Sequence, residues 1–547
     1  MQNDTEILWT AAFLNERFTE PVSPLGWSFV GALFEELALR EPLRFMGYPD
    51  AERIPATRLW RALPYVNVAV FQIIYKPFPD AFVPADAIRY FPHGDLAYRK
   101  RAPYPTALWQ PRFVLSLVTH LLREAWGASP LNYLKWRRFV PYHDAQTRRL
   151  QSSLDAANAA QTLLGILNAL YELDARLLRI HRWSLTYADV LYKILAQWTG
   201  ELAPILSCNV PNKTREVNAE LDALARLPAP LSTRLLERIN ANAALSADEQ
   251  RTADALARFL ERHGHRAFTL DLACPTFRED PTQLLPLLDT SARAKNWDDP
   301  AELQDAYLRA RGALRWWQRI VFRPLVALAR RYAQLREDQR YYWHKSLALT
   351  RRACLKLGAD LAAQGVLADA DAIFYATRPE VQAYYAGAIE SAELSARAAA
   401  RETEWREHLN EYRARGTGGY PHFLRGDTPL FERQDRDVPV QAWRGRGVSP
   451  GIARGAARIV RDPRDLGRVA VGEILVAPST DPAWTPVFAR LAGLVLERGG
   501  VLSHGAVVAR EYRLPAVTAV ANLTGALVDG EMIEIDGTNG IVKRIAT

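Results

Sequence analysis

Apolar residues recur at helical spacing over most of the first 385 residues. The spacing is clearest in residues 159–183, 217–227 and 322–365, and it predicts helices there, the last of them a long helix or a helix pair. An aromatic- and proline-rich region, residues 60–142, interrupts this pattern and predicts turns and short elements. We therefore expect a mainly α-helical domain over residues 1–385.

The pattern changes after residue 385. Residues 395–416 predict a polar, charged helix. Residues 416–447 are rich in Gly, Pro and Asp and lack periodicity, which is typical of a linker. We assign residues 386–445 to this helix and a flexible linker.

Short apolar runs rich in Val and Ile follow and predict strands. They lie at residues 455–460, 472–479, 492–498 and 515–520. A hairpin is expected around Asp536–Gly540, and helix-like segments lie between the runs. Residues 446–547 should thus form a compact α/β domain. The expected fold class is multidomain, a mainly α-helical N-terminal domain followed by a C-terminal α/β domain.

Composition bounds the function only loosely. The chain has 547 residues, which is too long for one core, and a net charge of +8 from 69 Lys+Arg against 61 Asp+Glu. Both signs are interspersed and no basic run with interleaved aromatics stands out, so we expect no nucleic-acid partner. The charge is compatible with anionic ligands such as phosphates.

Cysteine usage and hydropathy point to a reducing, aqueous compartment. Cys208, Cys274 and Cys354 are far apart, so they predict buried thiols rather than a disulfide framework or a metal site. The first ten residues have no apolar signal core, and no apolar run is long enough to span a bilayer. We expect a cytoplasmic protein with no membrane partner.

A lone histidine follows a pair of glycines near the C-terminus. Gly499 and Gly500 permit close backbone approaches, and Ser503 is a plausible N-cap for a helix that starts at His504. Free N–H groups and the positive dipole end of that helix favour an anion. A neutral imidazole there can act as a nucleophile and carry a phosphoryl group. The alternative is a histidine that only caps or packs.

The stretch GGVLSHGAVVAREYRLPAV, residues 499–517, resembles the phosphohistidine motif of the mobile, swivelling domain of phosphoenolpyruvate-utilising enzymes. Residues 447–460, 472–488 and 492–500 extend the resemblance, so it covers the whole C-terminal domain. It implies that His504 is phosphorylated and carries the group between two sites. The sequence STDPAWTP and Gly505 favour the rifampin phosphotransferase branch, although Ala519 stands where that family usually has glycine.

The motif brings further candidate residues for holding phosphate. Thr480 lies on a loop that could face the phosphoryl group, together with Asp481. For Asp481, a helix N-cap before Pro482 is a sufficient structural explanation. Arg510 could pair with phosphate, although arginines on exposed helix faces are commonly solvated.

The N-terminal domain resembles the substrate-binding domain of rifampin phosphotransferases at residues 9–28, 65–67 and 264–281. His265 and Arg266 are therefore candidates for binding phosphate or substrate, and a buried ion pair is the alternative. The family usually places a glutamate shortly after this motif, where this sequence has only Asp271. That difference questions an acid/base role at this position.

The stretch LREDQRYYWHK resembles a family segment with two basic residues four apart, matched here by Arg336 and Arg340. This spacing places both guanidinium groups on one helix face, where they could clamp a phosphoryl group in transfer. Arg340 stands where the family typically has lysine. The alternative is a solvated face interleaved with Glu337 and Asp338.

The resemblance implies an ATP-grasp domain that these residues do not match, so we expect a separate ATP-grasp protein to load His504. ATP and Mg²⁺ would act through that partner, with no cofactor or metal held firmly by this chain. Two functions follow. In one, His504 swings on the linker and phosphorylates a hydroxyl of a small, apolar or aromatic acceptor. In the other, the chain is a non-catalytic phosphohistidine carrier or regulatory protein whose helical domain docks a partner.

Overall fold

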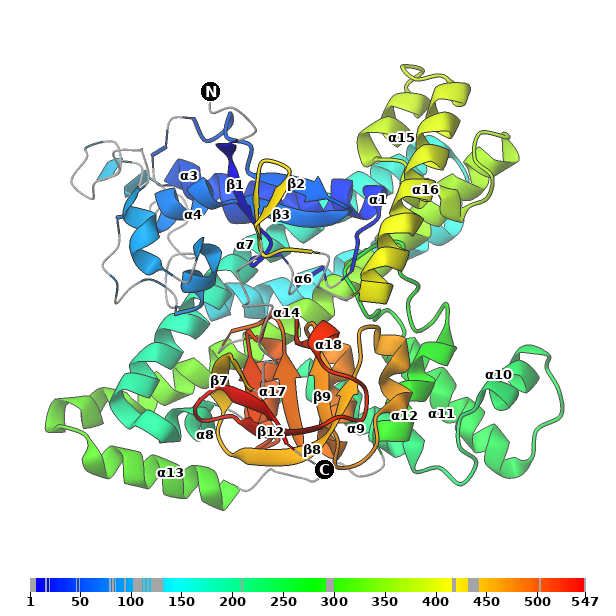
Figure 1. Ribbon diagram of the computed structural model, residues 1–547. Helices are drawn as coiled ribbons and strands as arrows, with labels where there is room; N and C mark the ends of the chain where they lie inside the picture. Colours follow the sequence, from blue (N-terminus) through cyan, green and yellow to red (C-terminus); the bar gives the residue numbers. More distant parts are fainter. Residues whose placement is uncertain are drawn as a thin grey trace.

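The computed structural model of the protein (Figure 1) spans residues 6–545. Within this span it describes all residues except 15–16, 19, 46, 49, 78–79, 81–82, 84, 93–94, 102–110, 112–113, 116–117, 120–130, 208–209, 292–299, 416–419, 431–441 and 501–502.

The elements follow one another in three groups along the chain. Before residue 132 they are β1 (Leu8–Thr10), α1 (Pro24–Gly26), η2 (Trp27–Gly31), α2 (Ala32–Phe34), η3 (Glu35–Arg40), α3 (Glu41–Phe45), β2 (Thr57–Trp60), β3 (Leu63–Asn67), α4 (Val68–Tyr75), η5 (Ala85–Tyr90) and η7 (Leu96–Arg101). The helical group is α6 (Asn132–Ala156), α7 (Ala160–Thr199), η8 (Gly200–Leu202), α8 (Ala203–Ser207), α9 (Lys213–Ala225), α10 (Thr233–Asn240), α11 (Ala247–His263), η9 (Pro281–Leu284), α12 (Leu285–Ser291), α13 (Pro300–Ala313), α14 (Trp316–Ala363), η10 (Asp371–Tyr375), α15 (Arg378–Tyr385) and α16 (Ser391–Arg415). The last group is β4 (Phe423–Arg425), β5 (Thr428–Leu430), β6 (Ala442–Arg444), β7 (Arg446–Ser449), β8 (Ile452–Ile459), η12 (Pro463–Arg468), β9 (Ile474–Ala477), η13 (Pro482–Arg490), β10 (Gly493–Leu496), α17 (His504–Glu511), β11 (Ala516–Thr518), α18 (Leu523–Ala526), β12 (Met532–Asp536) and β13 (Ile541–Arg544).

Long helices α6, α7 and α14 form the centre of the helical part. Helices α7, α9 and α14 confirm the periodicity, whereas α6 begins inside the region where turns and short elements were expected. A buried polar network joins α6, α7 and α14. Gln339 of α14 donates to Ser184 of α7 over 3.0 Å, and Asn132 of α6 donates to the same hydroxyl over 3.3 Å. Because these groups are buried, leaving any of them unpaired would be costly. The network therefore fixes the rotation of α14 about its own axis.

A five-stranded antiparallel sheet, in the order β2-β3-β1-β4-β5, corrects two expectations. The sequence predicted neither the strands of the first 67 residues nor those within the expected linker. In the structure, Leu8–Thr10 pairs with Phe423–Arg425, so the chain returns to its own N-terminal segment before the C-terminal domain. Residues 431–441, between β5 and β6, lie outside the described residues. The described part of the expected linker contains β4, β5 and β6 and is therefore structured.

The C-terminal domain is built on an eight-stranded sheet in the order β6-β13-β12-β8-β9-β10-β11-β7. Strands β8, β9, β10 and β11 run parallel, and the flanking strands pair antiparallel. Strands β9, β10 and β11 are buried at every position, as expected for parallel strands covered on both faces. The predicted strands, the hairpin between β12 and β13, and the α/β fold class are confirmed.

The C-terminal domain is docked against the helical part (Figure 1). Helix α12 packs on η12 and η13, and buried residues of both parts, among them Leu287 and Phe488, belong to one hydrophobic cluster. Ion pairs join Arg513 to Glu302 and Arg413 to Asp462. The structure therefore shows the domain in contact with helices rather than free.

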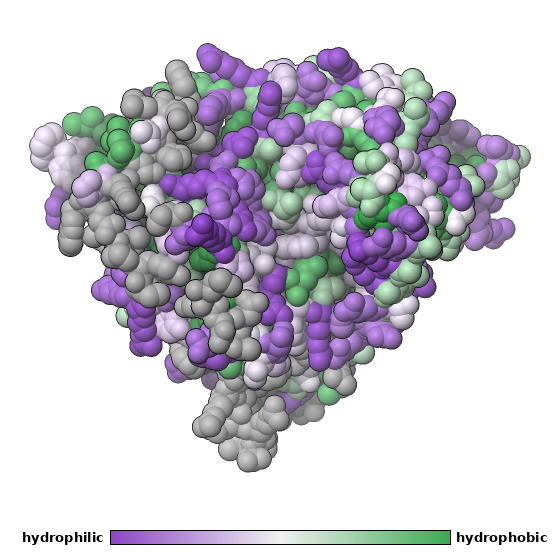
Figure 2. Space-filling view, turned by 90° about the horizontal axis from the view of Figure 1, so that it is seen from above, coloured by the Kyte–Doolittle hydropathy of each residue, from purple (hydrophilic) through white to green (hydrophobic). Residues whose placement is uncertain are grey.

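The outer surface is mixed in character. Figure 2 shows one face on which hydrophilic residues predominate and hydrophobic ones form small separate groups. Among the described helices, none combines the length and the apolar content needed to cross a membrane.

A buried glycine of α14 provides a test of this packing. A Cβ added at Gly358 would lie 2.1 Å from the carbonyl oxygen of Ala370, which is backbone and cannot rotate away. We expect Gly358→Ala to lower the free energy of unfolding by about 1–3 kcal/mol, measured by urea denaturation. Gly165→Ala is the control, because this helical glycine of α7 has open space around it. The control should be stabilised by roughly 0.5–1 kcal/mol, and equal effects of the two changes would contradict the packing.

Candidate functional site

The carboxyl ends of two neighbouring parallel strands bring the predicted phosphate-binding residues together. Strand β9 is followed by Thr480 and Asp481, and β10 is followed by Gly499 and the loop that leads to His504 at the start of α17. Because parallel strands end at the same edge of a sheet, both loops lie on one rim, the position where ligands bind in open α/β sheets. The connection β10–α17–β11 is a βαβ unit.

Two of the predicted glycines are required by the backbone or by close packing. Gly499 has φ 123°, in a region that side chains rarely adopt. A Cβ at Gly505 would lie 2.5 Å from Oγ1 of Thr480 and 2.6 Å from Leu496. Gly505 thus allows Thr480 to approach the first turn of α17. Gly500 accepts hydrogen bonds from Ser503 through its carbonyl.

The predicted side-chain cap is wrong. Ser503 occupies the N-cap position with extended backbone angles, but its hydroxyl donates to the carbonyl of Gly500 over 2.8 Å. No described side chain caps the first turn of α17. The N–H groups of this turn thus keep the capacity to bind an anion, because the first turn of a helix has no partners of its own.

The imidazole of His504 lies at the contact between the two parts of the protein. Its Nε2 is 3.2 Å from Oγ1 of Thr485 in η13, and its Nδ1 is 3.6 Å from a carboxylate oxygen of Glu337 in α14. His504 is 8% exposed, so its side chain is almost completely buried at this contact. The structure therefore places the predicted nucleophile against a carboxylate of the helical part.

Glu337 is held ionised by its neighbours. Burial raises its pKa, but the contact with His504 and the positive charges of Arg336 and Arg340 outweigh burial and lower the pKa to about 2. Both arginines are thus close enough to act on the same carboxylate. Arg336 and Arg340 are half-buried, and neither forms an ion pair with a described carboxylate. The predicted spacing on one helix face is confirmed by α14.

Arg266 approaches the same region from the loop after α11. It is buried, and this burial lowers the pKa of its guanidinium, whereas the charge of Asp481 raises it and that of Arg340 lowers it. His265 has a different environment, because its ring packs edge-on against Tyr341 with centroids 4.6 Å apart. Burial and nearby positive charges hold the pKa of His265 well below its usual value. Arg266 therefore joins the site electrostatically, and His265 is a neutral packing group.

Other candidates have structural partners. Asp271 accepts from the hydroxyl of Ser23 over 2.5 Å and from its N–H over 2.9 Å, so it fixes the start of α1. Arg510 donates to the carbonyl of Val448 over 3.0 Å and lies over the ring of Tyr192. Asp271 thus supplies no acid/base group, and Arg510 is a docking contact rather than a solvated residue.

Glu337 and Thr485 are the residues that sequence reasoning missed. The pattern of α14 placed Glu337 on a solvated face, because a charged residue beside two arginines is typical of one. Only its burial against the other domain reveals the contact. For Thr485, the signal was its position four residues after Asp481 in the loop that resembles the family motif.

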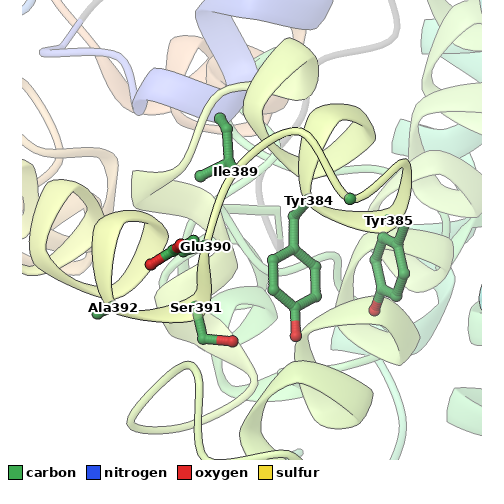
Figure 3. Close-up of a pocket in the computed structure, with 7 residues that line it drawn as sticks. Tyr384, Tyr385, Ile389, Glu390, Ser391 and Ala392 are labelled. Atoms are coloured by element: carbon green, nitrogen blue, oxygen red, sulfur yellow. The ribbon is translucent and has the colours of Figure 1, made fainter.

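A surface pocket of about 630 Å³ lies at another place, between α15 and α16 (Figure 3). It is lined by Tyr384, Tyr385, Gly387, Ile389, Glu390, Ser391 and Ala392. The hydroxyls of both tyrosines are already bound, one to Gln364 and the other to Asp360. In Figure 1, α15 and α16 lie away from α17, the helix that begins at His504.

Comparison with known proteins agrees with this geometry. Residues 469–540 match the family described as PEP-utilising enzyme, mobile domain, and residues 147–337 match the rifampicin phosphotransferase fourth domain. The first match contains His504, and the second ends at Glu337.

Several relatives share more of the chain. A rifampicin phosphotransferase of Streptomyces sp is 30% identical over 64% of this chain and 42% of its own length. Chondramide synthase of Chondromyces crocatus is 31% identical over 68% of this chain and 10% of its own length. The prodigiosin synthesizing transferase PigC of Serratia marcescens is 29% identical over 51% of this chain and 32% of its own length.

This chain therefore spans less than half the length of these relatives. Its two matched segments meet at the contact between His504 and Glu337. This chain thus contains one segment that matches the mobile domain of PEP-utilising enzymes and one that matches the rifampicin phosphotransferase fourth domain, and it is similar to rifampicin phosphotransferases over 64% of its length.

Proposed function

We propose that this chain is the carrier and acceptor part of a phosphotransferase, in which His504 delivers a phosphoryl group to a hydroxyl of a small molecule. The observation that carries the proposal is the position of His504, buried at the domain contact against Glu337 with Arg336 and Arg340 acting on the same carboxylate. A histidine that only capped its helix would not need this set of charges from another domain.

The two ring nitrogens of His504 have different tasks. Nδ1 faces Glu337, so the carboxylate favours a proton on Nδ1 and leaves Nε2 as the nucleophile. When the phosphoryl group is on Nε2, a proton on Nδ1 makes the imidazole a better leaving group. In transfer the N–P bond to His504 breaks and an O–P bond to the acceptor oxygen forms. The proton of the acceptor hydroxyl passes to a side chain of the site or to water. Glu337 thus activates delivery in the docked position.

The arginines supply positive charge where the transfer needs it. A phosphoryl group in transfer spreads negative charge over its oxygens, and preorganised cations stabilise that charge. Arg336 and Arg340 on α14 and the buried Arg266 lie on the acceptor side, and the first turn of α17 lies on the donor side. Phosphate would thus be held from both domains.

Loading requires a different position of the mobile domain. The His504 side chain is 7% exposed when docked, so a unit as large as an ATP-grasp domain cannot reach it there. We infer a movement of the C-terminal domain as a whole that carries His504 to an ATP-grasp unit outside these 547 residues. ATP and Mg²⁺ would bind in that unit, and no residue of this chain is assigned to them.

The acceptor is inferred from the relatives and the chemistry of the site. A relative is named rifampicin phosphotransferase, which supports a hydroxyl on an apolar or aromatic molecule. Aromatic side chains of the N-terminal part such as Tyr65, Phe71 and Phe91 are buried in cores, so they shape the scaffold rather than offer a free surface.

A second function, a phosphohistidine carrier without transfer to a small molecule, is supported by one observation. Asp271, at the place where the resemblance implies a glutamate, is occupied by Ser23 and supplies no acid/base group. The two functions predict different fates of the phosphoryl group, which the tests below separate.

The first test concerns His504 itself. Wild-type protein incubated with phosphoramidate, or with labelled ATP and an ATP-grasp protein of the phosphoenolpyruvate synthase type, should gain one acid-labile phosphoryl group, seen by intact mass. His504→Ala should gain none, because the nucleophile is gone. His408→Ala, a half-buried histidine on α16, is the matched control and should behave like wild type. Equal labelling of His504→Ala would refute the proposal.

The second test separates loading from delivery. Arg336→Ala should slow transfer from phosphorylated His504 to hydroxyl probes, rifampicin and benzyl alcohol, by about 10²–10³-fold, because transition-state charge loses a cation. Arg340→Lys, which restores the family residue, should retain most of the rate. Labelling of His504 by phosphoramidate should not change in either variant. Label that wild type passes to no hydroxyl compound would instead support the carrier function.

The third test uses pH. Glu337 has a pKa of about 2 when folded and 4.5 otherwise, so its ionised form stabilises the docked protein above pH 4.5. Glu337→Gln should therefore lower the free energy of unfolding at neutral pH by at most about 3 kcal/mol. The difference from wild type should shrink as pH falls from 4.5 towards 2, measured by denaturation at each pH. Glu393→Gln, in an exposed pair with Arg397, is the control, and an unchanged difference across this range would contradict the assignment.

A further inference from the structure

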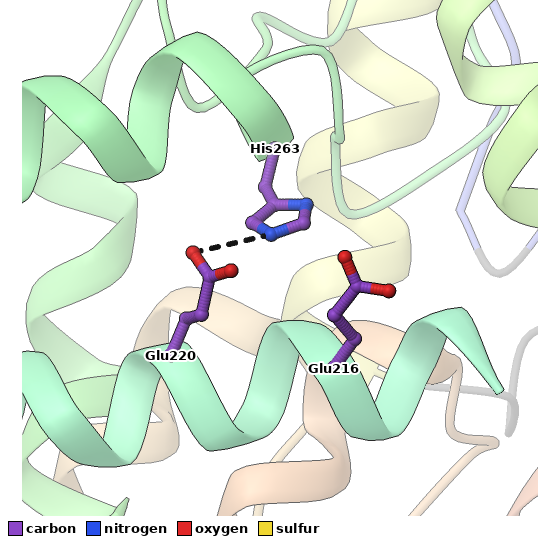
Figure 4. Close-up of side chains that lie close together, drawn as sticks. All are labelled: Glu216, Glu220 and His263. Atoms are coloured by element: carbon purple, nitrogen blue, oxygen red, sulfur yellow. Dashed lines mark ion pairs between the residues drawn. The ribbon is translucent and has the colours of Figure 1, made fainter. Parts of the chain in front are cut away.

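Two helices bring three ligand-type side chains together outside the phosphoryl site. Glu216 and Glu220 are one turn apart on α9, and His263 is the last residue of α11 (Figure 4). One ligand atom of each lies within 4.8 Å of those of the other two. His263 is 1% exposed and its ring points at both carboxylates, with Nε2 3.3 Å from Glu220.

The hydroxyl of Tyr341 lies 3.1 Å from the carbonyl of Arg262 and 3.0 Å from Nδ1 of His263. When the hydroxyl donates to the carbonyl, its oxygen can accept a proton from Nδ1. In this arrangement of the neutral ring, Nε2 presents a lone pair towards the two carboxylates. This nitrogen has no hydrogen-bond partner among the described residues.

A cation between Nε2 and the two carboxylates would bind all three groups at once. The site keeps room for this cation. Lys213 binds one oxygen of Glu216 over 2.5 Å, and Arg262 binds Oε1 of Glu220 over 2.6 Å, so each carboxylate retains an oxygen.

We propose that Glu216, Glu220 and His263 bind a divalent transition-metal ion. One imidazole nitrogen and two carboxylate oxygens suit Zn²⁺, whose ligand atoms lie about 2.0–2.2 Å from the metal. Glu216 is exposed, so a small rotation of its side chain closes the present spacing. Water would complete the coordination on the exposed side.

The geometry gives this ion a structural task. It would tie α9 to α11 at the point where α11 ends and the loop to Arg266 begins. Tyr341, which orients His263, lies next to Arg340 on α14. Such partners of a ligating histidine fix its tautomer and orientation. The metal would therefore hold the loop of Arg266 in register with α14, without taking part in phosphoryl transfer.

Zinc binding by the full chain tests the proposal and needs no activity. Wild-type protein should bind one Zn²⁺ by calorimetric titration and retain it after dialysis, measured by elemental analysis. Glu216→Gln and His263→Asn should each weaken binding by at least about tenfold, and Tyr341→Phe by about 10–100-fold. Circular dichroism verifies that each variant is folded. If His263→Asn unfolds, the variant Glu216→Gln still tests the site, because Glu216 is exposed.

Two control variants exclude unspecific binding. Asp254→Asn removes an exposed carboxylate of α11, and His408→Asn removes a histidine that lies 3.6 Å from Glu404. Both should bind zinc like wild type. The proposal is overturned if folded wild type retains no zinc, or if Glu216→Gln binds as tightly as Asp254→Asn. Retained binding by the controls together with weakened binding by Glu216→Gln, His263→Asn and Tyr341→Phe supports it.

Discussion

The contact between the imidazole of His504 and the carboxylate of Glu337 is the interaction on which the candidate site depends. It joins the proposed nucleophile, at a helix start of one domain, to an ionised group on the long helix of the other. A buried carboxylate is costly unless opposite charge surrounds it, and Arg336 and Arg340 supply that charge. Docking of the mobile domain thus completes an electrostatic arrangement that neither part holds alone.

Two scaffolds position this contact. In the C-terminal domain, the parallel strands β9 and β10 end at one rim and bring Thr480 next to the start of α17. In the helical part, the buried hydrogen bonds of Gln339 and Ser184 fix the rotation of α14, so that the neighbouring arginines face the rim. The zinc site proposed at α9 and α11 lies at the start of the loop that carries Arg266, and a bound ion would hold that loop in place.

Much of the fold followed from local patterns. Most of α14, the strands β8 to β11 and the turn between β12 and β13 were predicted because periodicity and turn residues act over short distances. The strand β1 was not, since it pairs with residues more than 400 positions later. The hydroxyl of Ser503 also behaved differently, because it turns towards the carbonyl of Gly500 and donates to it instead of accepting from an N–H of the first turn.

The sequence by itself indicated the candidate nucleophile His504, its glycines and the spacing of Arg336 and Arg340, because these features depend on neighbouring residues of one segment. Only the tertiary structure decided which groups meet that nucleophile. Glu337 has the pattern of a solvated residue, and Glu216, Glu220 and His263 have no spacing that predicts a metal site. Their environment arises from helices brought together by packing, and burial of charge depends on that packing rather than on the order of residues.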